Sequence, residues 1–426
     1  MTRGPAGGFE PAGLRVPGDP NRAAVHLRFL LLNQTFHPDV VSTAQHLTDL
    51  ALGLAGRGHE VSVVTGRRAY DRPEICFPRE EHWRGIRICR ISSTGFGKAA
   101  RWRRAADFTS FLAACGWRLA RLPRHDAVVA LTSPPLISFL GAWVARLQGS
   151  RFFYWVMDFN PDEAVAAGWL KRGSLATRVL EAMSRFSLRR AEKVIALDRF
   201  MGERVLAKGG APERIVVLPP WAQDAEVRFD PAGRERFRQA HGLEKKFVVM
   251  YSGNHSPCHP LDTLLQAAEQ LEGDRSIVFC FIGGGSEFAR VRRWAEQGDH
   301  KQLLSLPYRP LDELAGSLSA ADLHVVVMGD AFVGLVHPCK IYNILAVRGP
   351  VLYIGPPLSH ISEIAEKASD TLVCFPARHG DVATVVAHIR KARDAVVQSR
   401  GGRSSPLLAE YSKAALLPRL IAELES

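Results

Sequence analysis

Leu27-Arg-Phe-Leu-Leu-Leu32 opens the stretch that decides the fold, and Val61-Ser-Val-Val-Thr65 closes it. Both are short apolar runs of the kind that form buried strands. Between them, leucines recur at helical spacing from Leu47 to Leu54, and Gly58 stands where such a helix would end. This order predicts a β-α-β unit, whose crossover connection makes the two strands parallel.

The same alternation continues along the chain and restarts after Pro219-Pro220-Trp221. It predicts two doubly wound, Rossmann-like α/β domains that bind ligands at the carboxyl ends of their strands. Further strands are predicted at residues 127–131, 152–156, 193–197, 215–218, 247–251, 277–282, 303–306, 323–327, 351–354 and 371–374. We expect a disordered leader at residues 1–26, a first domain at 27–220, a linker at 221–245, a second domain at 246–405 and a C-terminal helix at 406–426.

The composition of the chain limits what it can do. With 426 residues and 46% hydrophobic content it can bury large cores, and its formal net charge of +12 indicates an anionic partner: nucleotide phosphates, nucleic acid or an acidic membrane surface. The seven cysteines contain no C-x-x-C pair and are typical of buried thiols in a reducing compartment. The leader lacks the apolar core of a secretory signal, and prolines interrupt the most apolar window, so we expect no transmembrane segment.

The segment Gly334-Leu-Val-His-Pro-Cys-Lys-Ile-Tyr-Asn-Ile-Leu-Ala346 predicts a helix that begins beside a bound anion. Pro338 suits the first helical position, because it lacks the N–H group that would be unpaired there. Lys340 follows in the first turn, where its charge opposes the positive end of the helix dipole. A bound phosphate would remove that conflict, so we predict a diphosphate site; the alternative is an ordinary loop-to-helix junction with a solvated lysine.

Two other loops of the second domain carry groups that suit a diphosphate. Gly283-Gly-Gly285 lies between a predicted strand and a predicted helix, where bare backbone can approach a phosphate, although it could equally be a tight connection. Residues 252–255 are predicted to contact the diphosphate, with His255 or His259 donating to the departing charge. The alternative is a polar loop that forms hydrogen bonds within itself.

The histidines and cysteines of these loops do not predict a metal site. Imidazole and thiolate are zinc ligands, but the spacing matches no usual zinc motif. The residues concerned are His255, Cys258, His259, His337 and Cys339. We therefore expect no bound metal.

Polar residues at two predicted strand ends of the first domain suit a hydroxylated substrate. Asp158-Phe-Asn-Pro-Asp-Glu163 follows one of these strands, and Asp158 or Asp162 could bind sugar hydroxyls. Asp162 and Glu163 are also explained as charges at the start of a helix, and for Glu163 we favour this explanation. The polar residues after the first strand of the domain are His37, Asp39, Ser42, Thr43 and Gln45.

Two basic segments indicate contact with an anionic membrane. Residues 98–124 carry seven lysines and arginines against one acid, interleaved with tryptophan and phenylalanine, and residues 171–190 are also basic. Arginine and tryptophan on one helix suit a membrane interface, whereas the alternative is a solvated helical face. Nucleic acid is not expected as a partner, because neither segment contains a recognisable binding module.

Taken together, the motifs resemble glycosyltransferase family 4, and most closely its branch of bacterial polysaccharide and colanic-acid type transferases. The resemblance covers nearly the whole chain from about Leu27 onward. The segments that carry it, in chain order, are Asn33 to Gln45, Arg57-Gly-His-Glu-Val61, Tyr251-Ser-Gly-Asn254, Gly283 to Gly285 and Pro338-Cys-Lys-Ile-Tyr342.

The resemblance implies a GT-B fold, in which two Rossmann-like domains face a central cleft. The first domain would bind the acceptor through residues such as His37, Ser42, Thr43, Gln45 and Asp158, and the second would bind a nucleoside-diphosphate sugar. It implies that transfer retains the anomeric configuration without a metal, with Lys340 and His337 at the diphosphate and Tyr308 and Arg309 at the base. The remaining sugar-donor contacts would be Gly253, Asn254, Gly283, Gly284, Cys339 and Tyr342.

The expected activity is transfer of a hexosyl or N-acetylhexosaminyl group to a glycan or polyprenyl-linked acceptor in cell-surface polysaccharide biosynthesis. The expected location is cytoplasmic, peripheral on the inner face of the plasma membrane. A GT-B epimerase or phosphorylase, or a non-catalytic paralogue that binds nucleotide sugars, is the alternative.

The chain also departs from the family pattern at three places in its second domain. Asn254 stands where many members have an arginine, and the following Cys258-His259-Pro260 contains no lysine. Leu335 and Asn343 occupy the spacing at which members often carry a pair of glutamates. We therefore expect the diphosphate to be neutralised by Lys340 together with His255 and His259.

Overall fold

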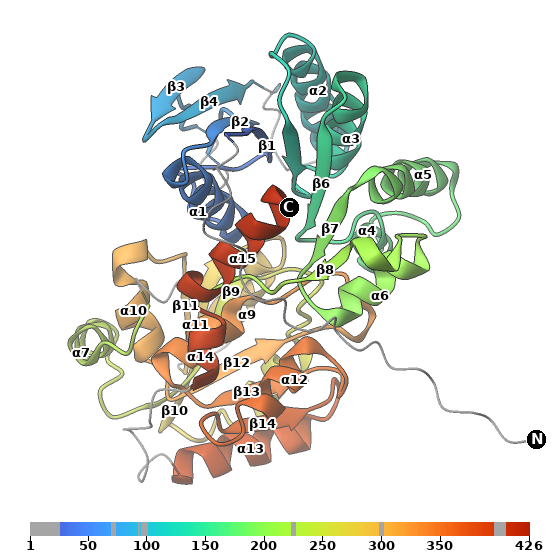
Figure 1. The fold of residues 1–426 in the computed structure, drawn as a ribbon. Helices are drawn as coiled ribbons and strands as arrows, with labels where there is room; N and C mark the ends of the chain where they lie inside the picture. The colour runs from blue at the N-terminus through green and yellow to red at the C-terminus, as the bar shows by residue number, and fades with distance from the viewer. Residues whose placement is uncertain are drawn as a thin grey trace, which may run out of the picture.

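The computed structural model describes residues 26–69, 74–92, 94, 101–222, 227–297, 302–395 and 406–426. All of the leader expected at residues 1–26 except His26 lies outside these residues. Figure 1 shows two lobes, each built around a sheet with helices packed against it. None of the described helices is long and apolar enough to cross a membrane.

The first lobe contains a sheet in the order β3-β4-β2-β1-β5-β6-β7-β8, in which only β3 runs antiparallel to its neighbour. The central strands are buried on both faces because helices cover them, which explains their continuous apolar runs. Its strands are β1 (Arg28–Leu32), β2 (Glu60–Gly66), β3 (Glu80–Trp83), β4 (Ile86–Ile91), β5 (Ala127–Ala130), β6 (Arg151–Val156), β7 (Lys193–Ala196) and β8 (Ile215–Val217). Its helices are α1 (Ser42–Gly56), α2 (Arg101–Leu119), α3 (Ile137–Gln148), α4 (Asp162–Ala166), α5 (Leu175–Arg190) and α6 (Arg199–Ala207).

The second lobe contains a sheet in the order β11-β10-β9-β12-β13-β14, with parallel pairing throughout. Its strands are β9 (Phe247–Asn254), β10 (Ile277–Gly284), β11 (Leu303–Leu306), β12 (Leu323–Val327), β13 (Val351–Ile354) and β14 (Cys374–Ala377). Its helices are α7 (Pro231–Ala240), α8 (Asp262–Gln270), α9 (Phe288–Gln297), α10 (Leu311–Ser319), α11 (Lys340–Val347), α12 (His360–Lys367) and α13 (Val382–Ala395).

The two lobes meet through loops at the carboxyl ends of their strands. The Phe159 backbone N–H, after β6, donates to the Leu335 carbonyl at 2.7 Å. Arg204 of α6 donates to the Val333 carbonyl through Nε and Nη2, at 3.1 and 3.0 Å. The strand order reverses at β1 and at β9, and these switch points are where such sheets bind ligands.

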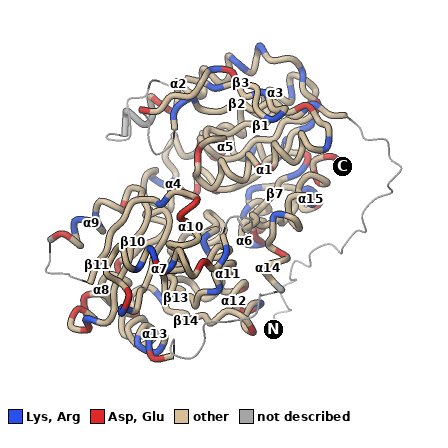
Figure 2. The backbone as a smooth tube through the Cα atoms, turned by 90° about the vertical axis from the view of Figure 1, so that its left-hand side faces the viewer, with Lys and Arg blue, Asp and Glu red and all other residues tan. Residues whose placement is uncertain are grey.

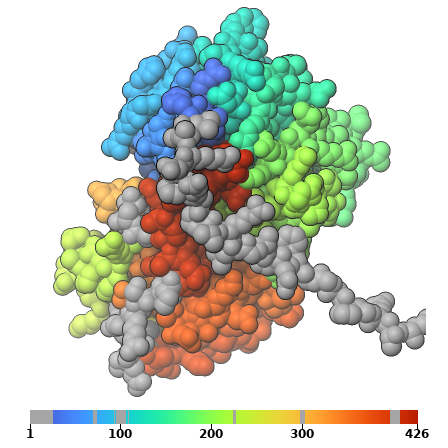
Figure 3. Space-filling view, in the orientation of Figure 1, coloured from blue at the N-terminus to red at the C-terminus, as the bar shows by residue number. Residues whose placement is uncertain are grey.

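The C-terminal segment joins the second lobe back to the first. Leu407 of α14 (Pro406–Glu410) lies in the core of the second lobe, whereas Leu420 and Leu424 of α15 (Lys413–Glu425) lie in the core of the first. Ser412 caps α15 by accepting from the Ala415 N–H, so the expected single helix is divided in two. Figures 1 and 3 show this segment lying between the lobes.

The structure differs from the sequence prediction at the ends of several elements. Strands β9 and β10 extend through Asn254 and Gly284, because glycines allow the two backbones to stay paired there. Helix α11 begins at Lys340 instead of Pro338, and β14 begins at Cys374 instead of residue 371. Strands β3 and β4 were not predicted.

Candidate active site

Glycines at the ends of β9 and β10 form a bare backbone surface, which we call the glycine floor (residues 253 and 283–285). Gly253 and Gly283 are paired and have φ angles of 138° and 143°. A Cβ on Gly283 would lie 2.0 Å from the Gly253 carbonyl oxygen, and a Cβ on Gly284 would lie 2.9 Å from the Tyr308 ring. No larger residue fits without moving backbone or ring, so a phosphate could approach the backbone closely here.

Lys340, the first residue of α11, places its amine on the glycine floor. A Cβ on Gly253 would lie 3.0 Å from the Lys340 Nζ, and Nζ lies 3.6 Å from the centre of the Tyr251 ring. The amine is buried and has no hydrogen-bond partner among the described residues. Burial lowers its pKa to about 7. A buried cation at the positive end of a helix is unfavourable alone, and an anion would relieve it.

His255 and His259 flank the same place as neutral rings. The Nδ1 atom of His255 lies 3.0 Å from the Gly253 carbonyl oxygen, and that of His259 lies 2.8 Å from the Val327 carbonyl oxygen. Burial, followed by the charge of Lys340, lowers the pKa of His255 to about 4 and that of His259 to about 3. Because Nδ1–H donates to a carbonyl, the neutral ring leaves Nε2 as an acceptor. Donation to a departing phosphate therefore requires that the ring first be protonated.

The predicted base-binding residues lie at the edge of the glycine floor. Tyr308 is 44% exposed and packs on Gly284. Arg309 instead forms an ion pair with Glu313, one turn further along α10. Asn254 is exposed, with its side-chain oxygen beside Gly285. The tyrosine ring is thus half-exposed at the edge of the glycine floor, whereas the arginine pairs with α10.

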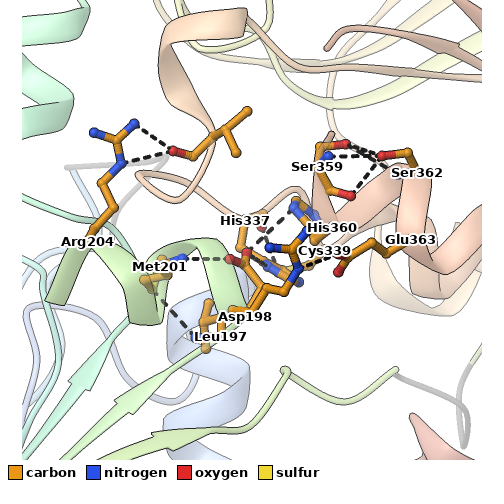
Figure 4. Close-up of polar contacts among 12 residues, drawn as sticks. Leu197, Asp198, Met201, Arg204, His337, Cys339, Ser359, His360, Ser362 and Glu363 are labelled. Atoms are coloured by element: carbon orange, nitrogen blue, oxygen red, sulfur yellow. Dashed lines mark hydrogen bonds and ion pairs between the residues drawn. The ribbon is translucent and has the colours of Figure 1, made fainter. Parts of the chain in front are cut away.

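The segment before α11 contacts the first lobe. His337 is buried, with Nδ1 2.7 Å from Asp198 Oδ2 and Nε2 2.8 Å from the Tyr342 hydroxyl. The Cys339 thiol donates to the His337 carbonyl at 3.2 Å, and burial raises its pKa to about 12. His337 and Tyr342 are thus held in a buried network with Asp198, which Figure 4 shows in part.

Most of the predicted acceptor residues after β1 form contacts within their own region. His37 stacks on Trp83 with ring centres 4.0 Å apart. Thr43 shares a 3.1 Å hydrogen bond with the Thr35 hydroxyl, and Gln45 donates to the Val40 carbonyl. Ser42 differs, because it is exposed and its hydroxyl interacts with the Cys339 thiol of the second lobe.

A pair of carboxyl groups after β6 faces the second lobe. Glu163 accepts from Asn160 Nδ2 at 3.3 Å and from the Cys258 thiol at 3.7 Å across the lobes. Burial raises the pKa of both Asp158 and Glu163, and the Asp158 charge raises that of Glu163 further. The pair therefore retains a proton near neutral pH. Our sequence interpretation treated Glu163 as a helix-start charge; it does lie in the first turn of α4, but it also contacts the second lobe.

Sequence reasoning also missed Asp198 and His360. Asp198 follows β7 at the same sheet edge as Asp158. Asp158 was singled out as a polar residue at a strand end, and Asp198 meets the same criterion. His360 is the first residue of α12 and stacks on His337 with ring centres 3.8 Å apart. The sequence gives no sign of this contact, because His337 lies before α11 and His360 begins α12, and no local pattern joins the two.

Comparison with known proteins gives matches along most of the chain. Residues 43–221 match the model of the glycosyl transferase 4-like domain. WcaI of Escherichia coli (strain K12), assigned as a colanic acid biosynthesis glycosyl transferase, is 24% identical over 380 residues, which cover 86% of this chain and 92% of WcaI. WbjE of Pseudomonas aeruginosa, assigned as a glycosyltransferase, is 26% identical over 257 residues, which cover 60% of this chain and 64% of WbjE.

A solved structure shares the fold. The crystal structure of Anabaena Alr3699/HepE in complex with UDP and glucose matches with a TM-score of 0.67 at 16% identity, covering 93% of this chain and 99% of that protein. At this identity the match establishes the arrangement of the two domains and their sheets.

Proposed function

Because this chain is a GT-B glycosyltransferase of the family 4 type, we propose that it moves a sugar from a nucleoside-diphosphate sugar to a glycan or lipid-linked acceptor, with retention of the anomeric configuration. The process we propose for it is cell-surface polysaccharide biosynthesis, in keeping with the assignment of WcaI. In this proposal the second domain binds the sugar donor and the first domain binds the acceptor.

One observation carries the proposal: the buried amine of Lys340 lies on the glycine floor and has no hydrogen-bond partner in the described part of the chain. A diphosphate laid across this floor would approach backbone N–H groups and the amine together. The UDP complex of Anabaena HepE, a protein of the same fold, supports a nucleoside diphosphate as the anion.

In the proposed reaction the bond between the anomeric carbon and the phosphate oxygen breaks, and a bond forms between that carbon and an acceptor hydroxyl oxygen on the same face of the sugar. The acceptor proton passes to the departing phosphate oxygen, so no separate base is required. Lys340 stabilises the charge that develops on the phosphate, and it does so more strongly than in water because the site is buried. Asp158 and Glu163, opposite Cys258, would hold sugar hydroxyls at the transfer point.

An apolar pocket next to this carboxyl pair supports an acceptor with an apolar portion. It has a volume of about 170 Å³ and lies among α3, α4 and α5, lined mainly by side chains such as Leu136, Phe139, Leu180 and Met183. Thr132 and Asn160, which bond to Asp158 and Glu163, stand at its edge. An apolar chain held here would leave its attached sugar near the carboxyl groups.

We further propose that the first lobe rests on an anionic membrane at the inner face of the plasma membrane. Exposed apolar side chains include Trp117 of α2, Trp143 and Leu147 of α3, and Leu175 of α5. Arg121 lies over the Trp117 ring at 3.2 Å, and basic residues occur along these helices (Figure 2). Apolar and basic side chains together suit an anionic lipid surface. Of the basic segment at residues 98–124, residues 98–100 and the side chains of 101–105 and 108 lie outside the described part.

The decisive experiment follows nucleoside diphosphate release by the full chain. A thermal-shift screen against nucleoside-diphosphate sugars first identifies the sugar donor, because ligand at about a hundred times its dissociation constant adds about 2.7 kcal/mol of stability. Release of nucleoside diphosphate only when an acceptor lipid extract is added, with the product linkage retaining its configuration, supports the proposal. An epimerised sugar donor without acceptor, phosphate-dependent cleavage, or binding without turnover would overturn it in favour of an epimerase, a phosphorylase or a binding protein.

A further inference from the structure

The segment that leads into α11, residues 333–339, is held by the first lobe, and we call it the junction segment. Arg204 of α6 donates to the Val333 carbonyl through Nε and Nη2. The Phe159 N–H, after β6, donates to the Leu335 carbonyl. Two carbonyl groups of the junction segment, two residues apart, are thus bonded to the first lobe and not to the lobe that carries them.

Two further contacts bring the junction segment against the first lobe. A Cβ on Gly334 would lie 2.6 Å from the Phe200 carbonyl oxygen, so only glycine lets the two backbones approach this closely. The Ser42 hydroxyl of α1 hydrogen-bonds the thiol of Cys339, the last residue of the segment. Lys340 follows directly, so the first lobe helps to determine where this lysine lies.

The contact at the centre of the junction segment is a buried hydrogen bond from His337 to Asp198. Asp198 Oδ1 caps α6 by accepting from the Met201 N–H at 2.8 Å, and Oδ2 lies 2.7 Å from His337 Nδ1. Burial raises the pKa of Asp198, but the hydrogen bond and the charge of His337 outweigh it and keep that pKa below its ordinary value. The carboxyl group is therefore ionised, and a hydrogen bond to a carboxylate is stronger than one between neutral groups.

The opposite edge of the His337 ring is bonded to α11. Its Nε2 lies 2.8 Å from the hydroxyl of Tyr342, which stands two residues after Lys340 on that helix. His360 stacks on the ring, with ring centres 3.8 Å apart and an interplanar angle of 18° (Figure 4). A ring held at both edges and on one face has a single orientation, so it connects the position of Asp198 to the first turn of α11.

We propose that Asp198 is a positioning residue for the sugar donor: through His337, it places the Lys340 amine on the glycine floor. The diphosphate site of the second lobe is then complete only with a side chain from the first. No bond of the transfer reaction changes at Asp198 or His337. This inference rests on the proposed function, because it assigns to the acceptor-binding domain an effect on sugar-donor binding.

Asp198→Asn tests the hydrogen bond while keeping the helix cap. Its Oδ1 can still accept from the Met201 N–H, but its amide nitrogen donates where Oδ2 accepted. The neutral His337 ring must then accept at Nδ1 and donate from Nε2 to the Tyr342 hydroxyl, so both bonds reverse and the carboxylate charge is lost. We expect the ring to hold α11 less firmly.

The first measurement is binding of UDP, GDP, ADP and dTDP to the full chain by calorimetry. For the nucleotide that binds wild type, Asp198→Asn should raise the dissociation constant by about tenfold or more, because misplacement by about 1 Å can cost a hundredfold. Glu363→Gln is the matched control. It removes the ion pair with Arg199, which also joins the two lobes but does not reach the junction segment, and it should stay within about twofold of wild type.

Initial rates distinguish positioning from general damage to the junction between the lobes. Asp198→Asn should lower kcat/KM for the sugar donor by about 10- to 100-fold and leave the KM for acceptor unchanged. Tyr342→Phe, which removes the hydroxyl at the other edge of the His337 ring, should change the same constant in the same direction. It keeps the proposal testable if Asp198→Asn does not fold.

A double-mutant cycle tests whether Asp198 acts through Lys340. In a Lys340→Met background, Asp198→Asn should change kcat/KM for the sugar donor by less than about twofold further. Losses that multiply would overturn the proposal, as would nucleotide binding and sugar-donor kinetics of Asp198→Asn that match wild type. Wild-type protein that binds none of the four nucleotides would instead contradict the proposed function, and the positioning role with it.

Discussion

The glycine floor of the second lobe and the loop after β1 in the first lobe are both polar regions at strand ends, yet they are built differently. The floor consists of backbone and the buried amine of Lys340, which has no hydrogen-bond partner among the residues that the structure describes. In the loop after β1, Thr43 and Gln45 bond to their own region and His37 stacks on Trp83. The first region is thus incomplete without an anion, whereas the second is largely satisfied by itself.

This difference between the two regions corresponds to a difference between the two proposed substrates. A diphosphate is present in every such sugar donor, so a rigid backbone site can serve for all of them. An acceptor is distinguished by its hydroxyl groups, which side chains must recognise. We therefore expect substitutions at the glycine floor to have large effects, and substitutions in the loop after β1 to have small ones.

The largest effect is expected from Lys340→Met, which keeps the apolar stem and removes the charge. Loss of one group that stabilises developing charge typically lowers kcat by about 10²–10³-fold. The free protein should become no less stable, because an unpartnered buried cation has been removed. Transfer rates and chemical denaturation measure the two effects. Lys367→Met on the exposed end of α12 is the control, and transfer by Lys340→Met within twofold of wild type would refute the role of the amine.

Gly283→Ala should rank next, because the floor depends on close contact between two backbones. The new Cβ would lie 2.0 Å from the Gly253 carbonyl oxygen at a φ of 143°. The backbone conformation alone should lower the free energy of unfolding by about 1–3 kcal/mol, and the overlap adds to this loss. Gly58→Ala is the matched control, since Gly58 has a φ of 85° but nothing within 4 Å of the new Cβ. Equal losses in the two variants would mean that the contact with Gly253 is unimportant.

The carboxyl pair between the two regions should give a smaller, pH-dependent effect. Burial raises the pKa of Glu163 from 4.5 to about 8, so the folded state binds a proton that the unfolded state releases between these values. The stability associated with the protonated group is complete below about pH 4.5 and is lost as the pH rises toward 8. Glu163→Gln should therefore differ least from wild type at and below about pH 4.5, and its stability should exceed that of wild type by a growing margin as the pH rises toward 8.

Denaturation at several pH values measures this difference. Glu366→Gln, at an exposed position of α12, provides the control and should follow wild type throughout. A Glu163→Gln stability that runs parallel to wild type across this range would show that the carboxyl group is ionised in the folded protein.

The fold could be predicted because the buried strands are short apolar runs separated by helical patterns. Strand β3 was not predicted because Glu80–Trp83 is only four residues long, mostly polar, and pairs at the edge of the sheet. In β4 (Ile86–Ile91), Arg87 and Arg90 interrupt the apolar residues, unlike the continuous apolar runs of the central strands. The role of Lys340 could be predicted because it depends only on neighbouring residues: a lysine in the first turn of a helix opposes the helix dipole.

The parts of the site that join the two lobes could not be predicted in this way. Asp198 and His337 are 139 residues apart, and Glu163 and Cys258 are 95 residues apart. Asp198 and Glu163 each have an ordinary local explanation, as a helix cap and as a charge at a helix start. Their contacts exist only when the two domains are brought together, and the sequence patterns describe each domain separately.

The smallest effect is expected from Ser42→Ala, the one predicted acceptor residue of the loop after β1 whose hydroxyl points to the second lobe. A single hydrogen bond contributes about 0.5–1.5 kcal/mol, so the KM for acceptor should rise by about two- to tenfold while sugar-donor binding stays unchanged. Thr43→Val is the matched comparison, because the Thr43 hydroxyl bonds to Thr35 inside the loop and its loss should lower stability without changing the acceptor KM. Initial rates at varied acceptor and sugar-donor concentrations separate the two constants. If Ser42→Ala raised the KM for the sugar donor instead, the loop after β1 would belong with the glycine floor, and the division of the cleft into two regions would be wrong.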